Sequence, residues 1–229
     1  MKKTKSRAST SLSPTRIVDE AIQLIEADGL ELFSTRRLGE RLGCEAMSIY
    51  HHFPSKGELL DAIASRLLGL CELPGPERGS PRQRLAIALR SAYDVARRYP
   101  GSAILYVTRR LNSVEAMNLL EWFFGIAEEM GFDTFMQVNQ FRLMGQWING
   151  VILTYLAATM KTEAPTRRVA ASEIDVARYP RVRQATPYFL PDHLDEHFDL
   201  LLEEVLDAVE AAPRRRPRAP KRGGGRSTA

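Results

Sequence analysis

The amino-acid sequence predicts an all-α fold, and three observations support that prediction. Apolar residues recur every three or four positions in most segments between residues 14 and 210, as they do on one face of a helix. Two segments open with Ser followed by Pro, and several close with Gly or Pro, which are residues that begin and end helices. No segment alternates polar and apolar residues as a half-buried strand would.

The first helix is expected to begin at Ser13 and Pro14 and to end at Gly29. Its apolar residues share one face, so it should pack behind the elements that follow. They are Ile17, Ala21, Leu24 and Ile25.

A short second helix should follow Ser34, whose side chain can cap it. Leu38 and Leu42 lie four residues apart and share the inner face of this helix. Gly43 supplies the left-handed turn that ends it. The sequence therefore predicts one short helix followed by a tight turn.

A third short helix is predicted over residues 46–52, with Ile49 pointing to the core, because Pro54 forbids its continuation. Ser55 and Glu58 then form a capping box that starts a connecting helix. Two short helices joined by a Gly-containing turn are typical of the helix-turn-helix, in which the second helix enters the major groove of DNA.

Five more helices are predicted beyond the Pro- and Gly-rich stretch at residues 73–76. They are expected near residues 80–99, 102–111, 113–131, 133–160 and 192–210. The helix at 133–160 is apolar around nearly its whole circumference, so it should be buried on several sides. Residues 161–190 lack a long periodic pattern, which indicates a loop with one short helix.

The run IYHHFPSKGELL at residues 49–60, following the turn at Gly43, resembles the TetR/AcrR family of transcriptional regulators. In that family a Tyr, a His and an aromatic residue close the recognition helix before a Lys-containing cap. The resemblance implies an N-terminal three-helix helix-turn-helix DNA-binding domain, joined by a long helix to a helical ligand-binding and dimerisation domain. A structural helical hairpin in another all-helical protein is the alternative.

The expected organisation along the chain has four parts, and the boundary between the two domains lies within the connecting helix near Arg66. The parts are a basic disordered arm at 1–12, a DNA-binding domain at 13–66, an effector-binding and dimerisation domain at 67–212, and a basic disordered tail at 213–229.

The resemblance carries DNA contacts to nine positions. Thr35, Tyr50 and Lys56 match the phosphate anchors of the family. The base-reading or groove-facing positions are Arg36, Ala46, Met47, Ser48, His51 and His52. Arg36 should read a guanine, since its planar fork matches O6 and N7 together, whereas Ala46 and Met47 can offer only apolar contacts, for example to thymine methyl groups.

The resemblance also implies an effector pocket in the helical body, with a mostly apolar set of candidate lining residues. They are Tyr93, Leu105, Trp122, Phe123, Phe141, Gln146, Trp147 and Asn149. The tetracycline-repressor branch holds a magnesium complex of its drug with polar groups at positions that here carry Glu72, Ile87 and Leu105. Two of these three cannot ligate a metal, so we expect no metal, no other cofactor, and an apolar or aromatic effector.

A homodimer is expected through the helices near 134–160 and 192–210, which would form a four-helix interface with their copies. Burial of both apolar stripes inside the monomer is the alternative. A two-fold dimer would present two recognition helices to a palindromic operator, and the effector would release this repressor from DNA.

Charge is distributed unevenly along the chain, whose net charge is +4. Residues 1–16 and 213–229 hold 12 of the 32 basic residues and no acid, so residues 17–212 carry 20 bases against 28 acids. Because nucleic-acid binding depends on neutralising phosphates, the basic N-terminal arm should add contacts to DNA. Tails that only keep the protein in solution are the alternative.

Within the acidic body, the basic side chains of the helix-turn-helix must be placed selectively. Arg36, Arg37 and Lys56 should face the phosphate backbone, while acids such as Asp19 and Glu26 face away from it.

Two other classes of function compete with that of a specific regulator. An enzyme is disfavoured because the sequence has no G-x-S-x-G, phosphate-loop or H-E-x-x-H motif and only four histidines. A DNA binder that is indifferent to sequence is favoured by the basic tails alone.

Two further features bear on the surroundings of the protein. Cys44 and Cys71 are too few for a disulfide scaffold and are read as ordinary thiols, although Cys44 beside His51 and His52 could instead sense oxidants or metals. The N-terminus lacks an apolar signal core, and no apolar run is long enough to span a bilayer, so we expect a cytoplasmic protein without a membrane partner.

Overall fold

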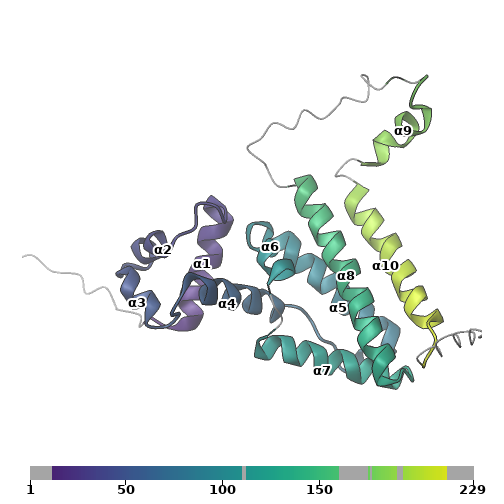
Figure 1. Cartoon of the computed structure of the whole chain (residues 1–229), viewed down its shortest axis with the longest axis horizontal. Helices are drawn as coiled ribbons and strands as arrows, with labels where there is room; N and C mark the ends of the chain where they lie inside the picture. Colours follow the sequence, from purple (N-terminus) through teal and green to yellow (C-terminus); the bar gives the residue numbers. More distant parts are fainter. Residues whose placement is uncertain (1–11, 110–111, 160–174, 176, 190–192, 216–229) are drawn as a thin grey trace, which may run out of the picture.

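The computed structural model describes residues 12–109, 112–159, 175, 177–189 and 193–215, and regular secondary structure within these ranges is helical throughout. The predicted all-α fold is therefore confirmed. Two hydrophobic cores organise the molecule, one in a small N-terminal unit and the other in a larger helical body (Figure 1).

The N-terminal unit contains α1 (Pro14–Asp28), α2 (Thr35–Leu42), α3 (Ala46–Tyr50) and α4 (Lys56–Leu68). A serine caps three of these helices by accepting a hydrogen bond from a backbone N–H three residues later, at 3.2–3.3 Å. All four helices contribute fully buried side chains to one core. Examples are Ile17, Leu38, Ile49, Leu59 and Ile63.

The helix α3 ends at Tyr50, two residues before the predicted end at His52. The N–H groups of His52 and Phe53 both donate to the carbonyl of Ile49, at 3.0 and 2.9 Å, so the chain already turns there. Pro54 therefore follows a turn and does not itself terminate the helix.

The turn between α2 and α3 depends on two glycines. Gly43 has φ of 71°, in the left-handed region expected for it. A Cβ at Gly39 would lie 2.7 Å from the carbonyl oxygen of Cys44 and 3.3 Å from the nitrogen of Ala46. The close approach of α2 to the following backbone therefore requires a residue without a side chain at position 39.

The helical body follows a connection that contains the short helix η1 (Pro76–Arg78). Its helices are α5 (Pro81–Arg98), α6 (Pro100–Thr108), α7 (Val114–Glu129), α8 (Thr134–Thr159), α9 (Pro180–Ala185), η3 (Thr186–Phe189) and α10 (Leu194–Ala211). The five expected helices are present as α5, α6, α7, α8 and α10, but α6 runs from Pro100 to Thr108 and not from Ser102 to Leu111. Proline fits its first helical position.

The long helix α8 is buried on one side only, so the expectation of burial on several sides is wrong for a single chain. Its buried residues recur every four positions. They are Met136, Gln140, Met144, Ile148, Ile152 and Leu156. Neighbouring helices α5, α6, α7 and α10 cover this side, whereas Leu143 and Leu153 on the opposite side are 38% and 43% exposed.

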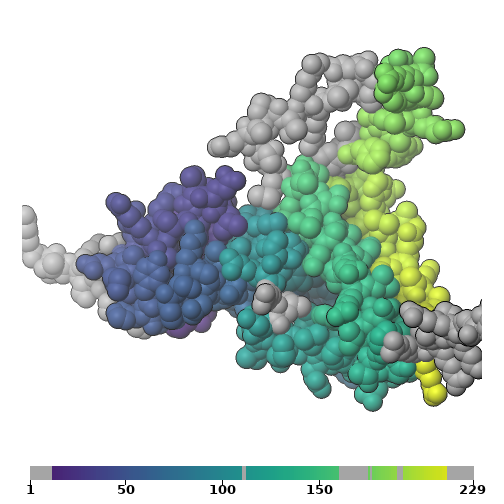
Figure 2. Space-filling model, viewed as in Figure 1, coloured from purple at the N-terminus to yellow at the C-terminus, as the bar shows by residue number. Residues whose placement is uncertain are grey.

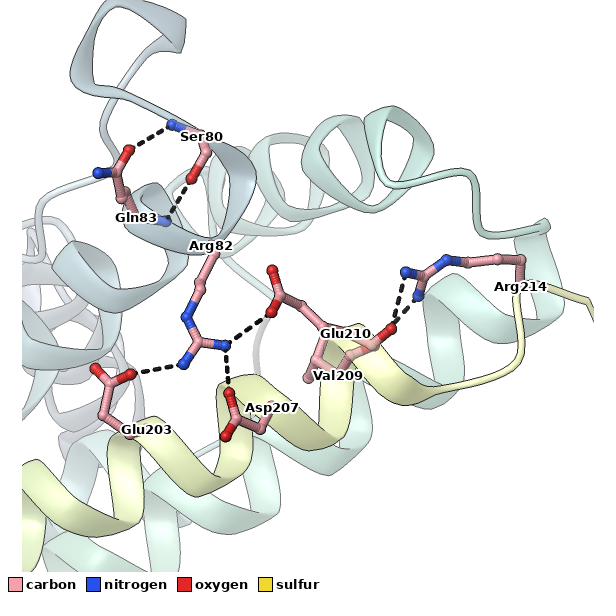
Figure 3. A network of polar contacts seen from close by, with 8 residues as sticks. All are labelled: Ser80, Arg82, Gln83, Glu203, Asp207, Val209, Glu210 and Arg214. Carbon is pink, nitrogen blue, oxygen red and sulfur yellow. Dashed lines mark hydrogen bonds and ion pairs between the residues drawn. The ribbon is translucent and has the colours of Figure 1, made fainter.

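The last helix is fixed to the body by a cluster of ion pairs around Arg82 of α5 (Figure 3). Its guanidinium lies 2.6 Å from Glu203, 2.7 Å from Asp207 and 2.9 Å from Glu210 of α10. Beyond α10, Arg214 donates to the carbonyl of Val209 at 3.3 Å. The α10 helix is thus held along its C-terminal half.

Parts of three predictions fall outside the described residues. These are the basic arm, except for residue 12, most of the loop at 161–190, and the tail from residue 216 onward. Within the described part of the chain, no helix combines the length and the apolar character needed to cross a bilayer.

We predict that Gly39→Ala lowers the free energy of unfolding by about 1–3 kcal/mol, because the added methyl group must push backbone atoms apart. Denaturant unfolding followed by circular dichroism measures this change. Gly125→Ala in α7 is the control, since nothing lies within 4 Å of its Cβ, and there a gain of about 0.5–1 kcal/mol is expected. Equal stability changes in both variants would contradict the close approach at Gly39.

Candidate nucleic-acid interface and cavity

The predicted DNA-contacting residues come together at the end of the N-terminal unit that carries α2 and α3. The hydroxyl groups of Thr35 at the start of α2 and Tyr50 at the end of α3 are 3.1 Å apart. The ammonium of Lys56, at the start of α4, donates to the carbonyl of Phe33 at 2.8 Å and lies 5.4 Å from the centre of the Phe33 ring. The three predicted phosphate anchors therefore lie at neighbouring helix termini.

The α3 helix presents a mixed surface. Met47 is 62% exposed, and His51 and His52 are exposed just beyond the helix, while Ala46 and Ser48 are half-buried. Ile49 is fully buried and orients the helix against the core. An exposed apolar side chain between polar groups offers van der Waals contact but only weak hydrogen bonding.

The arginines of α2 are paired with acids of the same unit. Arg36 lies 3.2 Å from Glu40, and the two side chains are 87% and 64% exposed. Arg37 lies 2.8 Å from Asp28. Exposed pairs of this kind contribute only about 0–1 kcal/mol, so Arg36 can leave Glu40 for a stronger partner at little cost.

The acids expected to face away from DNA are engaged elsewhere. Asp19 lies 3.0 Å from Arg66 of α4. Glu26 of α1 accepts hydrogen bonds from the backbone N–H groups of Gly101 and Ser102, at 2.9 and 2.8 Å. Both groups lie in the first turn of α6, which has no side-chain cap of its own, and Ser102 also donates to the Tyr99 carbonyl at 3.1 Å. A carboxylate of the N-terminal unit therefore caps a helix of the body.

The helical body contains a cavity of about 300 Å³ against the C-terminal end of α4. Side chains from α4, its following loop, α5, α6, α7 and α8 enclose it, and most of them are apolar. Five of the eight predicted lining residues border it. They are Trp122, Phe123, Phe141, Gln146 and Asn149.

The other three predicted lining residues, Tyr93, Leu105 and Trp147, do not border this cavity. Tyr93 stacks on Phe198 of α10 with ring centres 4.2 Å apart, and the Trp147 ring lies 5.7 Å from the same phenylalanine. Leu105 is buried in the N-terminal core. Each lies on a helix that borders the cavity but faces another neighbour.

Tyr93 belongs to the contact between α5 and α10. Its hydroxyl donates to Asp195 at 3.2 Å. Burial, together with the nearby negative charge of Asp195, raises the pKa of the Tyr93 phenol to about 12. The phenol is therefore neutral at physiological pH and serves packing.

Sequence reasoning missed four polar or charged side chains at the cavity: Cys71, Tyr106, Arg109 and Arg142. Burial raises the pKa of the Cys71 thiol to about 11, and burial also raises the pKa of the adjacent Tyr106. The sequence could have indicated Arg142 as a functional residue, because it is the only charged residue among the 26 residues of α8. Arg109 stands beyond the end of α6, and no periodic pattern marked it.

The α6 helix joins the cavity to the N-terminal unit. Its N-terminus is held by Glu26 of α1, and Leu105 in its middle is buried in the N-terminal core. Just beyond its C-terminus, Arg109 donates to Asp61 of α4 at 3.0 Å. Because Tyr106 and Arg109 also border the cavity, the same segment contacts both the cavity and the helices behind α2 and α3.

Comparison with known proteins follows this division of the chain. The family model of bacterial regulatory proteins of the tetR family matches residues 17–63. The model of the tetracyclin repressor-like C-terminal domain matches residues 73–212. Together the two matches span both hydrophobic cores.

Individual proteins resemble nearly the whole chain. The HTH-type transcriptional repressor DrrR1 of Streptomyces coeruleorubidus is 29% identical over 224 residues, which cover 92% of this chain and 82% of the relative. A protein of Streptomyces coelicolor A3(2), described as a possible TetR family transcriptional regulator, superposes with a TM-score of 0.77 at 21% identity, covering 87% and 99% of the two chains. The TetR family protein ActR of Streptomyces coelicolor, in complex with actinorhodin, superposes with a TM-score of 0.73 at 22% sequence identity. The match covers 87% of this chain and 97% of ActR.

We predict that Glu26→Ala lowers the free energy of unfolding by about 1 kcal/mol, because two N–H groups of α6 lose their charged acceptor. Glu26→Gln, which keeps one carbonyl acceptor, should lose less. Denaturant unfolding measures both variants. Glu31→Ala serves as the control because Glu31 is exposed and has no ion pair among the described residues, and a loss there as large as at Glu26 would rule out the cap.

Proposed function

The chain belongs to the TetR family of bacterial regulatory proteins, and on that premise we propose that it is a homodimeric repressor which leaves a palindromic operator when a small effector binds. One observation carries the proposal. The cavity lies against α4, which belongs to the unit that presents α3, and against α6, which packs on that unit. A ligand that alters the position of α4 would therefore change the position of the DNA-reading surface.

For DNA binding, we assign phosphate contacts to Thr35, Tyr50 and Lys56. Thr35 and Lys56 are the first residues of α2 and α4, where free backbone N–H groups also favour anions. The Tyr50 hydroxyl at the end of α3 lies 3.1 Å from the Thr35 hydroxyl. Arg36 would exchange Glu40 for a guanine, and Met47 would provide apolar contact in the groove. The remaining groove-facing positions are Ala46, Ser48, His51 and His52.

For assembly, we propose that α8 and α10 form the dimer interface. The two helices lie side by side at the end of the molecule away from α2 and α3, where Figure 2 shows their green and yellow surfaces together. One stripe of exposed residues on α8 steps by three and four positions and carries no charge, although Arg142 beside it is exposed. It consists of Asn139, Leu143, Gln146, Gly150, Leu153 and Ala157.

Uncharged exposed surface on a helix this long is typical of a subunit interface. On α10, Leu200 and Leu201 are 61% and 39% exposed and extend the apolar surface. In a two-fold dimer through these helices, the two recognition helices would contact half-sites whose centres lie about one turn of DNA apart, ~34 Å.

For the effector, we propose a molecule with an apolar or aromatic body. Trp122 exposes its ring to the cavity while its indole N–H donates to the carbonyl of Pro74 at 2.9 Å, so its hydrogen-bonding group is already used. Phe123 and Phe141 add further aromatic surface. The related ActR is a complex with actinorhodin, which supports a small-molecule ligand for this fold.

The residues at the tetracycline-repressor metal positions do not favour a magnesium complex. Ile87 and Leu105 have no ligating atom, and Glu72 lies 2.9 Å from Arg78 in an ion pair. We therefore propose a ligand that binds without a metal.

We predict different effects for a base-reading and a phosphate-binding residue. After operator selection from random DNA, Arg36→Ala should relax specificity at one base pair by about 1–3 kcal/mol. Lys56→Ala should weaken binding to all DNA sequences alike. It should also reduce the slope of log affinity against log salt concentration by about 1. Fluorescence anisotropy with labelled duplexes measures both. Wild-type protein that selects no operator would instead favour a sequence-indifferent DNA binder.

We predict that Leu153→Glu shifts the protein from dimer to monomer, because two like charges would be buried in a symmetric interface. Light scattering coupled to size-exclusion chromatography measures the mass. Leu32→Glu is the matched control, since Leu32 is 62% exposed in the N-terminal unit and should leave the mass unchanged. A Leu153→Glu variant that remains dimeric would place the interface elsewhere.

A further inference from the structure

We propose that the effector carries an anionic group, and that Arg109 binds this group in exchange for its bond to Asp61 of α4. The inference rests on the proposed function, because it assigns a ligand class and a release step to the cavity already described. In this proposal the ligand acts by binding Arg109, which then no longer pairs with the Asp61 carboxylate of α4.

Arg109 is placed to contact both a ligand and α4. Arg109 borders the large cavity, and its Nη1 lies 3.0 Å from an Asp61 carboxylate oxygen. The Arg109 side chain is 31% exposed and Asp61 is 43% exposed, so the pair is neither sealed in the core nor fully solvated. A partly exposed pair is weak enough to exchange partners.

A second, smaller cavity lies on the α4 side of Arg109. Its volume is about 20 Å³, and Asp61, Ser65, Tyr106 and Arg109 are among the residues around it. Leu68, Tyr106 and Arg109 border both cavities, so they separate the larger space from the polar face of α4. A small rotation of the Arg109 side chain would move its charge from one space to the other.

The charge of the large cavity favours an anion. Among the described residues that border it, the ionised side chains are Arg109 and Arg142, and no Asp or Glu is present. The other walls are mostly apolar, which strengthens electrostatic attraction by excluding water. Arginine can bind a carboxylate through two parallel hydrogen bonds, whereas an uncharged group would leave its charge uncompensated.

Arg142 of α8 also borders the cavity. It is exposed, and it has no ion pair among the described residues. A cation at the rim attracts an anionic ligand from solution, while Arg109 at the α4 side would receive it inside. The apolar body of the ligand would then lie between them against Trp122 and Phe141.

Loss of the Asp61 bond would loosen α4. Two polar bonds tie this side of α4 to the segment after α6: Asp61 with Arg109, and Ser65 with Glu115 at the start of α7. The hydrogen bond from Ser65 lowers the pKa of Glu115, so that carboxylate stays ionised. Removing one of these two bonds would weaken the attachment of α4 to this segment, and α4 leads back to the turn after α3.

Linkage gives the proposal a distinctive signature. If Asp61 and the ligand compete for Arg109, Asp61→Asn should bind anionic ligands more tightly and the operator more weakly. Arg109→Gln should bind both more weakly. A residue that only supports the fold would not move the two affinities in opposite directions.

The experiment uses the full-length protein and two probe pairs of equal shape. The probes are naphthalene-2-carboxylate with naphthalene-2-carboxamide, and anthraquinone-2-carboxylate with anthraquinone-2-carboxamide. Calorimetry without DNA measures probe binding, and anisotropy of a selected operator measures DNA binding separately. Asp19→Asn is the matched control, because Asp19 pairs with Arg66 of α4 at 3.0 Å but does not border the cavity.

We expect at least one carboxylate to bind at least tenfold more tightly than its amide, with the difference lost in Arg109→Gln. Asp61→Asn should gain two- to fivefold in carboxylate affinity and lose at least as much in operator affinity, while Asp19→Asn keeps the wild-type carboxylate affinity. Circular dichroism verifies that each variant is folded.

Equal affinity for carboxylate and amide would overturn the anionic class while leaving the cavity as an effector site. Failure of all four probes to bind would overturn the proposal as well. Unchanged or weaker carboxylate binding in Asp61→Asn would overturn the exchange at Arg109. A wild-type protein that binds carboxylates but selects no operator would refute the proposed repressor function alone, so the two failures are distinguishable.

Discussion

The capping of α6 by Glu26 is the interaction on which the arrangement of the two units depends. Tyr99 at the N-cap offers no side-chain hydrogen bond, so the first-turn N–H groups of α6 need an outside acceptor. A carboxylate of α1 supplies it, and Leu105 is then buried in the N-terminal core. A cavity formed inside the body is thereby in contact, through one helix, with the unit that carries α3.

Local sequence signals predicted the helix-turn-helix closely. The serine caps, the left-handed Gly43 and the buried Ile49 act within a few residues, so they can be read from spacing alone. These local signals did not predict the end of α3, because the Ile49 carbonyl accepts the hydrogen bonds of the turn before the chain reaches Pro54. Gly39 escaped notice because its need for a missing Cβ arises from backbone that returns after the turn.

The cavity was only partly predictable, for a reason of geometry. Periodicity identifies the apolar residues of a helix but not the neighbour that each one faces. Trp122 and Phe141 face the cavity, whereas Tyr93 stacks on Phe198, which lies more than 100 residues later in the chain. Glu26 and Arg109 were missed as connecting residues because both act on segments far away in sequence. Exposed uncharged side chains on α8 likewise emerge only once its neighbours are in place.

Hydrogen exchange at α6 tests most directly whether this helix couples the cavity to the DNA-reading surface. The amides of Gly101 and Ser102 should be followed with and without a selected operator. If α6 and the N-terminal unit move together, operator binding should slow exchange at these two amides, although they lie outside the DNA-contacting helices. Slower exchange confined to α2 and α3, with no change at Gly101 and Ser102, would contradict the coupling.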